Sequence, residues 1–215
     1  NQGMGTPLPP MKTPENLDWD RWIGAAPWRP YNKGLAPHDW RAWQDFGGGS
    51  LGDMACHIMD PIYMSLKLVE AEHFSVEVVE QKGVNSETFP ISSTIKYSFP
   101  ARGDMPPVEL TWYDGQTNLP PLPKNLGDSV VDANIPPPST GKAENKSRPP
   151  GKVIYGEDLT FKGGSHATTL QILGSKAQDM KSKLPDVPKS PSNHFKNFLL
   201  ACQGQETCRS PFSVA

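Results

Sequence analysis

The residues best suited to chemistry gather in one stretch, where Asp53, His57 and Asp60 follow one another at intervals of four and three. On a helix these intervals place the three side chains on one face. A carboxylate one turn from an imidazole fixes the ring's tautomer and tilt, which suits a general base that takes a proton from a hydroxyl. A purely structural Asp–His hydrogen bond is the alternative. A metal site is disfavoured, because ligands from one helix with no second cluster seldom complete one.

The element that must carry these residues is a helix predicted over 50–68. Its apolar positions recur at helical spacing, Ser50 is placed to cap it, and Asp53 at the third helical position completes a start like a capping box. Pro61 lacks an amide donor, so we expect a kink or local break there.

Gly47, Gly49 and Gly52 match the G-x-G-x-x-G pattern of dinucleotide-binding loops. That loop requires a buried aliphatic strand immediately before it, whereas residues 38–46 are polar and aromatic. We therefore interpret the glycines as a tight turn that lets the backbone approach a neighbour closely before the helix begins.

The remaining pattern indicates an α+β fold without a Rossmann domain in this chain. Two shorter helices are predicted over 16–24 and 192–203. Segments rich in β-branched and aromatic residues predict strands at 74–81, 91–99, 108–113, 152–155, 159–162 and 168–173. One long helix before consecutive strands predicts an open, mostly antiparallel or mixed sheet covered by helices on one face.

The domain organisation follows from composition. Residues 1–49 are expected to form an extended, Trp-rich connecting segment, and residues 50–215 an α/β domain. The chain contains 24 prolines, many of them in a predicted surface insertion at about 114–151. The uncovered face of the predicted sheet should be apolar and should drive formation of a dimer or higher homo-oligomer.

Charge, hydropathy and cysteine content exclude several classes. The net charge is −2 with no basic block, so nucleic acid is not expected as a partner. No apolar run reaches the roughly 20 residues that span a bilayer, so no membrane partner is expected. Three cysteines without a C-x-x-C argue against a disulfide framework or a zinc site, although Cys202 and Cys208 could pair across a short loop.

Residues 45–60, DFGGGSLGDMACHIMD, resemble the active-site helix of the glucose–fructose oxidoreductase / inositol dehydrogenase / MocA (Gfo/Idh/MocA) family, in which a glycine-rich turn opens a helix bearing D-x-x-x-H. Residues 17–24, with Trp40-Arg-Ala-Trp43 further on, are similar to a bacterial branch of that family. Residues 193–202 are similar to its late helix. The bacterial branch is often exported, which implies the periplasm.

The resemblance implies an enzyme of two domains, a Rossmann domain followed by a substrate-side α/β domain. The family's catalytic lysine lies in an E-K-P motif of the first domain, and this sequence has neither that motif nor a nucleotide fold. The resemblance therefore implies that His57 is the general acid/base and Asp53 its partner. It also implies that NAD or NADP serves the intact protein but does not bind this chain, which would be inert alone. The implied substrate is a sugar, a sugar derivative or a cyclitol.

Further pocket residues are predicted around this helix. Arg41, with Trp40 and Trp43 on either side, could bind hydroxyls and the C–H face of a sugar ring, although the tryptophans could equally pack the loop onto the domain. Asp60 and His194 are candidate substrate ligands, and a capping contact is the alternative for His194. A rival interpretation of the whole chain is a non-catalytic interaction or oligomerisation module, in which the His57 helix is structural.

Overall fold

The computed structural model describes residues 8–124, 129–130, 151–166, 170–174, 176–185 and 189–211, and its fold is α+β as predicted. The predicted insertion lies mostly outside the described residues. The helices and 3₁₀ turns are α1 (Trp19–Ile23), η1 (Asp39–Ala42), α2 (Gly49–Ser65), η2 (Leu68–Glu70), α3 (Lys176–Lys181) and α4 (His194–Cys202). None of the helices described has the length and apolar character needed to cross a membrane.

The strands form two sheets rather than the single sheet expected. They are β1 (Ser75–Lys82), β2 (Ser92–Phe99), β3 (Val108–Asp114), β4 (Ser129–Val130), β5 (Lys152–Tyr155), β6 (Thr160–Gly163) and β7 (Gln171–Leu173). The first sheet has the order β1-β2-β3 and the second the order β4-β7-β6-β5. Every strand pair described is antiparallel.

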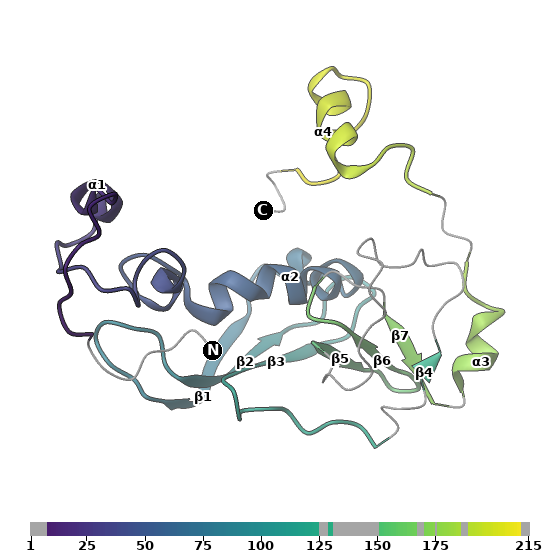
Figure 1. The fold of residues 1–215 in the computed structure, drawn as a ribbon. Coiled ribbons are helices and arrows are strands. Elements are labelled where there is room, and N and C mark those ends of the chain that lie inside the picture. The colour runs from purple at the N-terminus through teal and green to yellow at the C-terminus, as the bar shows by residue number, and fades with distance from the viewer. Residues whose placement is uncertain are drawn as a thin grey trace.

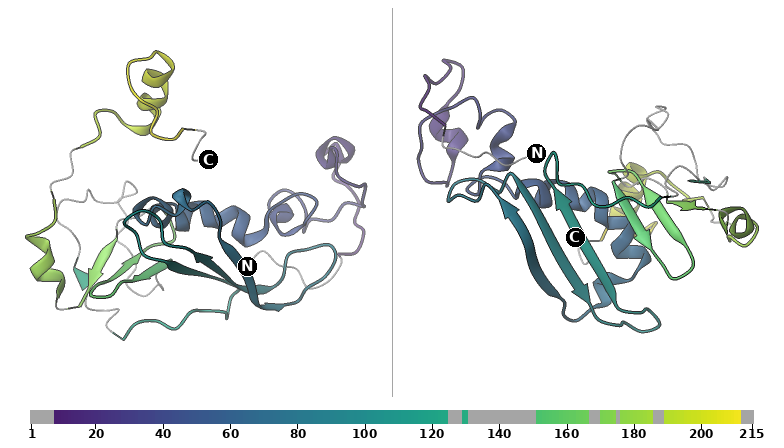
Figure 2. Two further views of the ribbon diagram at one scale, coloured as in Figure 1. Left: turned by 180° about the vertical axis from the view of Figure 1, so that it is seen from behind. Right: turned by 90° about the horizontal axis from the view of Figure 1, so that it is seen from below.

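Helix α2 covers one face of the first sheet (Figures 1 and 2). Ile62 of α2 packs with Leu68 and with Phe99 of β2 in a buried cluster, which the partly buried Ile154 of β5 joins from the second sheet. Alternate residues of a strand point to one face, so this packing turns Tyr97 and Phe99 towards the helix and their neighbours away from it. The helix that carries His57 is therefore fixed on a sheet.

The opposite face of the first sheet is charged, which corrects the expectation of an uncovered apolar face. Lys96 of β2 pairs with Glu77 at 3.1 Å and with Glu109 at 3.6 Å, one partner on each neighbouring strand. The hydrogen bond to Glu77 and the charge of Glu109 raise the pKa of Lys96. This ion network places charge where the expected self-association required apolar surface, and the self-association itself stays a prediction.

The N-terminal segment has a core of its own. Trp19 of α1, Tyr31, Leu35 and Trp43 are buried together, and Trp19 stacks on Trp22 with ring centroids 4.7 Å apart. This segment was expected to be an extended connection, but its tryptophans make it a packed unit. Helix α1 lies within the predicted range 16–24 but is shorter, because it begins after the N-cap Asp18 and ends before the C-cap Gly24.

Two details of α2 differ from expectation. The helix begins at Gly49 with Gly48 as its N-cap and no side-chain capping hydrogen bond, so Ser50 does not cap it. The helix also continues through Pro61 to Ser65, whose hydroxyl donates to the Pro61 carbonyl at 2.6 Å. Packing of Ile62 on the sheet holds the final turn in place despite the missing proline donor.

Helix α4 stands apart from α2 and both sheets in the two opposed views (Figures 1 and 2). Asn193 caps it by accepting from the Lys196 amide. Glu206, in the loop that follows, accepts from the Ser192 hydroxyl at 2.7 Å and from the Asn197 amide at 2.8 Å. Cys202 and Cys208 are free thiols, so they are not paired across this loop.

We expect acid to loosen this loop through Glu206. The hydrogen bonds from Asn197 and Ser192 lower the pKa of Glu206 from 4.5. The stabilisation is therefore complete above that value and is lost as the pH falls through the lower pKa of the folded state. NMR signals of α4 followed down in pH should report the loosening. Glu206→Gln should remove this pH dependence, and an unchanged acid response in that variant would contradict the assignment.

Candidate functional site

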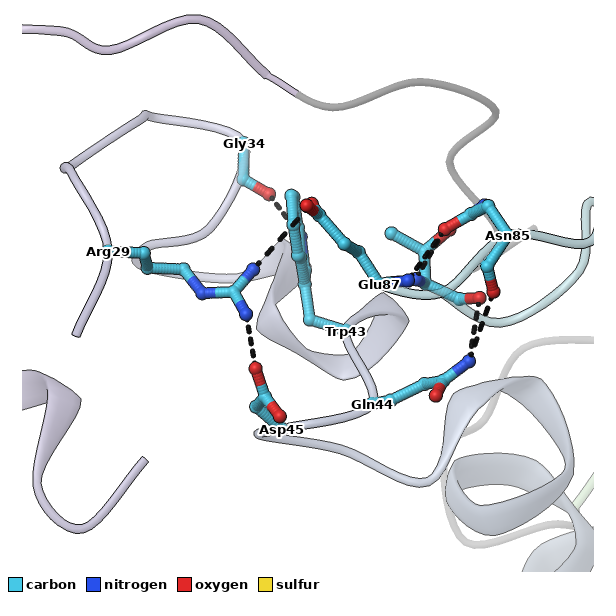
Figure 3. Close-up of polar contacts among 8 residues, drawn as sticks. Arg29, Gly34, Trp43, Gln44, Asp45, Asn85 and Glu87 are labelled. Carbon is cyan, nitrogen blue, oxygen red and sulfur yellow. Dashed lines mark hydrogen bonds and ion pairs between the residues drawn. The ribbon is translucent and has the colours of Figure 1, made fainter. Parts of the chain in front are cut away.

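The turn that opens α2 is held by contacts that cross the chain (Figure 3). Arg29 donates to Asp45, lies 3.9 Å from Glu87, and places its guanidinium 4.9 Å from the centroid of the Trp43 ring. Gln44 donates to the Thr88 carbonyl at 3.1 Å. These contacts tie the residues before the glycine turn to the connection between β1 and β2. Sequence patterns did not indicate Arg29 as the centre of these contacts.

Gly47 and Gly49 are close-approach positions, as interpreted from the sequence, whereas Gly52 is not. A Cβ on Gly47 would lie 2.6 Å from the Cα and carbonyl oxygen of Arg41, and one on Gly49 would lie 2.6 Å from the ring of Phe89. The 3₁₀ turn η1, rather than a parallel strand, precedes the motif, and both described sheets are antiparallel. The described residues therefore do not fit a dinucleotide at this loop.

A matched pair of glycine variants tests this role. Gly47→Ala should destabilise the chain by about 1–3 kcal/mol, because the backbone of Arg41 would have to move. Gly52→Ala, in open space inside α2, should stabilise it by about 0.5–1 kcal/mol. Urea unfolding measures both. Equal effects at the two positions would show that close approach is not what Gly47 provides.

Arg41 binds Asp53, which lies one helical turn before the predicted catalytic residue His57. Its Nε donates to Asp53 Oδ1 at 3.2 Å, its Nη1 donates to the His38 carbonyl at 2.7 Å, and its guanidinium lies 4.7 Å from the centroid of the Trp40 ring. Arg41, Trp40 and Asp53 are thus brought together, whereas the pairing of Asp53 with His57 stays a prediction. The Asp53 carboxylate orients this arginine, and both side chains are partly exposed.

Trp43 and His194 are not brought into this group. Trp43 is only 2% exposed and packs in the N-terminal core, where its Nε1 donates to the Gly34 carbonyl at 3.3 Å. Its position corrects the prediction of a pocket tryptophan and agrees with the packing alternative. His194 is the first residue of α4, with its ring 5.7 Å from that of Phe195, and α4 lies away from α2 (Figure 1).

His57 and Asp60 are exposed on α2, so their side chains are open to a ligand. The His57 ring lies 5.4 Å, centroid to centroid, from the ring of His166, which follows β6. No sequence pattern predicted that these two histidines lie close together, since their proximity depends on where the second sheet lies. Among the described residues, no three potential metal ligands are grouped to hold an ion.

Comparison with known families supports the predicted resemblance. Residues 3–101 match the model of an oxidoreductase family, namely its C-terminal alpha/beta domain of the Gfo/Idh/MocA type. Residues 3–101 of this chain are therefore similar to the C-terminal domain of Gfo/Idh/MocA oxidoreductases. The match includes the glycine turn, all of α2, and strands β1 and β2. A search of curated proteins gives no match.

The matched residues correspond to the C-terminal rather than the nucleotide-binding part of such oxidoreductases. That agrees with the antiparallel sheets and with the poor fit of a dinucleotide to the glycine turn. The predicted similarity of residues 193–202 to the family's late helix lies outside the matched range and stays a prediction.

Proposed function

We propose that this chain is the substrate-side part of an NAD- or NADP-dependent oxidoreductase that acts on a hydroxyl of a sugar, a sugar derivative or a cyclitol. The observation that carries the proposal is the exposed His57 on α2, one turn after an Asp53 that Arg41 orients. In this proposal another domain binds the nicotinamide cofactor, because the described residues do not fit it.

His57 has the role of general base. An exposed imidazole can accept the proton of a substrate hydroxyl. Arg41 and Trp40 lie on the same side of the glycine turn, where a guanidinium donates to hydroxyls and an indole face packs on ring C–H groups. Asp60, exposed one turn after His57, is a further acceptor for substrate hydroxyls.

The test is turnover by the protein that carries this chain together with its nucleotide-binding domain. We expect reduction of NAD or NADP when D-glucose or myo-inositol is supplied, and we expect none from the 215 residues alone. Nicotinamide reduction followed by absorbance measures this. Failure to turn over any hexose, sugar acid or cyclitol in a broad panel would contradict the proposal.

The second candidate function, an interaction or oligomerisation module, has one observation in its favour. Three valines of the edge strand β1, Val76, Val78 and Val79, are each more than half exposed. A second copy that pairs along β1 would cover them, whereas the charged sheet face would not serve. Light scattering of the wild-type chain and of Val78→Lys distinguishes the possibilities, since association through β1 would be lost in the variant.

A further inference from the structure

We propose that the candidate site has a second side, formed by the segment that follows β6 in the second sheet. His166 in that segment is a substrate-positioning residue. The inference rests on the proposed function and extends it. Helix α2 supplies His57, whereas the segment after β6 supplies His166, 109 positions later in the sequence. The two histidines therefore bring together α2, which packs on the first sheet, and the end of β6 in the second sheet, where the substrate is proposed to bind.

The geometry suits a ligand with several hydroxyls. The two rings are inclined by 31° with centroids 5.4 Å apart, and both side chains are exposed. Each imidazole offers one donor and one acceptor nitrogen when neutral. The Ser165 hydroxyl lies 3.3 Å from Nδ1 of His166, so the proposal assigns ligand binding to Nε2. Hydroxyls on neighbouring ring carbons could then bind one imidazole each.

The backbone of the segment that carries His166 is held by hydrogen bonds from a buried lysine. Lys152, the first residue of β5, is only 6% exposed, and its ammonium donates to the Gly164 carbonyl at 2.7 Å and to the His166 carbonyl at 3.0 Å. Burial of an ammonium costs free energy unless the group is hydrogen-bonded. The backbone conformation that brings these two carbonyls to Lys152 is therefore favoured. Lys152 thereby fixes the backbone of His166.

Gly151 packs closely against the backbone of the same segment. A Cβ at this position would lie 2.4 Å from the backbone nitrogen and Cα of Ser165, so only glycine allows the approach. Its amide donates to the Gly163 carbonyl at 2.9 Å, which closes the end of the β5–β6 pair. Two successive residues, Gly151 and Lys152, therefore determine where Ser165 and His166 lie.

The test follows both imidazoles directly. In the chain labelled at its five histidines, titration with myo-inositol and with D-glucose should shift the side-chain NMR signals of His57 and His166 with one common dissociation constant. His166→Gln should weaken binding by about three- to tenfold, the scale of one neutral hydrogen bond. The matched control is His73→Gln, an exposed histidine at the end of the first sheet, which should bind as the wild type does.

Turnover gives the second measurement. His166→Gln should raise KM by a similar factor and leave kcat within threefold, because a positioning residue contributes to binding rather than to proton transfer. If the NMR signal of His57 responds to the sugar but His166→Gln changes neither the binding affinity nor KM, the role of His166 is overturned and the proposed function is not. No response at either histidine to any sugar or cyclitol would overturn both this inference and the proposed function.

Discussion

Replacement of His57 by alanine should lower turnover by about two to four orders of magnitude, the usual scale for loss of a general base. The measurement is initial rates in the protein that carries both domains. The melting temperature should stay near that of the wild type, because the imidazole is exposed and contributes little packing.

Asp53→Asn is the companion variant. It keeps the shape of the side chain and removes its charge, so the ion pair with Arg41 is weakened while the helix persists. Its loss of turnover should be smaller than that of His57→Ala. A structural role for the pair gives the reverse pattern, a lower melting temperature with turnover within threefold of the wild type, and that result would refute the catalytic assignment.

The largest expected effect on stability comes from Trp43→Ala. The indole is 2% exposed, fills the N-terminal core, and lies under the Arg29 guanidinium. Truncation of a buried tryptophan costs about 3–5 kcal/mol of unfolding free energy, because packing is lost and a cavity remains. Denaturant unfolding followed by tryptophan fluorescence measures the loss.

Trp28→Ala provides the matched control in the same segment. Trp28 is 68% exposed, and its Nε1 donates to Asp20 at the surface at 3.1 Å. Its replacement should change the unfolding free energy by less than about 1 kcal/mol. If both tryptophan variants unfold alike, the burial of Trp43 does not stabilise this segment.

Local patterns in the sequence predicted the elements well, since helical spacing and β-branched runs act over a few residues. Helix α2 and strands β1 to β3 begin and end within a few residues of the predicted bounds, and β5 has them unchanged. The start of α2 was placed one residue late because backbone approach at the glycines, rather than a Ser50 cap, determines it. Of the kink or local break predicted at Pro61, the break does not occur, because the helix continues to Ser65 and Ile62 packs on the sheet.

Only the part of the site whose residues are close in sequence could be predicted. Arg41, Asp53 and His57 lie within 17 positions of one another, so turn and helix geometry could group them. The encounter of His57 with His166 and the anchoring by Lys152 depend on how two sheets meet, which no short-range pattern encodes. The split of the strands into two sheets and the charged open face also depend on strand pairing across long separations.

The two separate cores have a consequence for cooperativity. One core joins Trp19 to Trp43 in the N-terminal segment, and the other joins Ile62, Leu68 and Phe99 beneath α2. Units that bury different apolar surfaces can melt at different denaturant concentrations, so a single transition is not assured. Tryptophan fluorescence weights the first core, which holds Trp19 and Trp43, whereas far-ultraviolet circular dichroism weights the strands and α2. Non-coincident transitions by these two probes would mark the first core as a unit that opens while α2, which carries His57, and the two sheets stay folded.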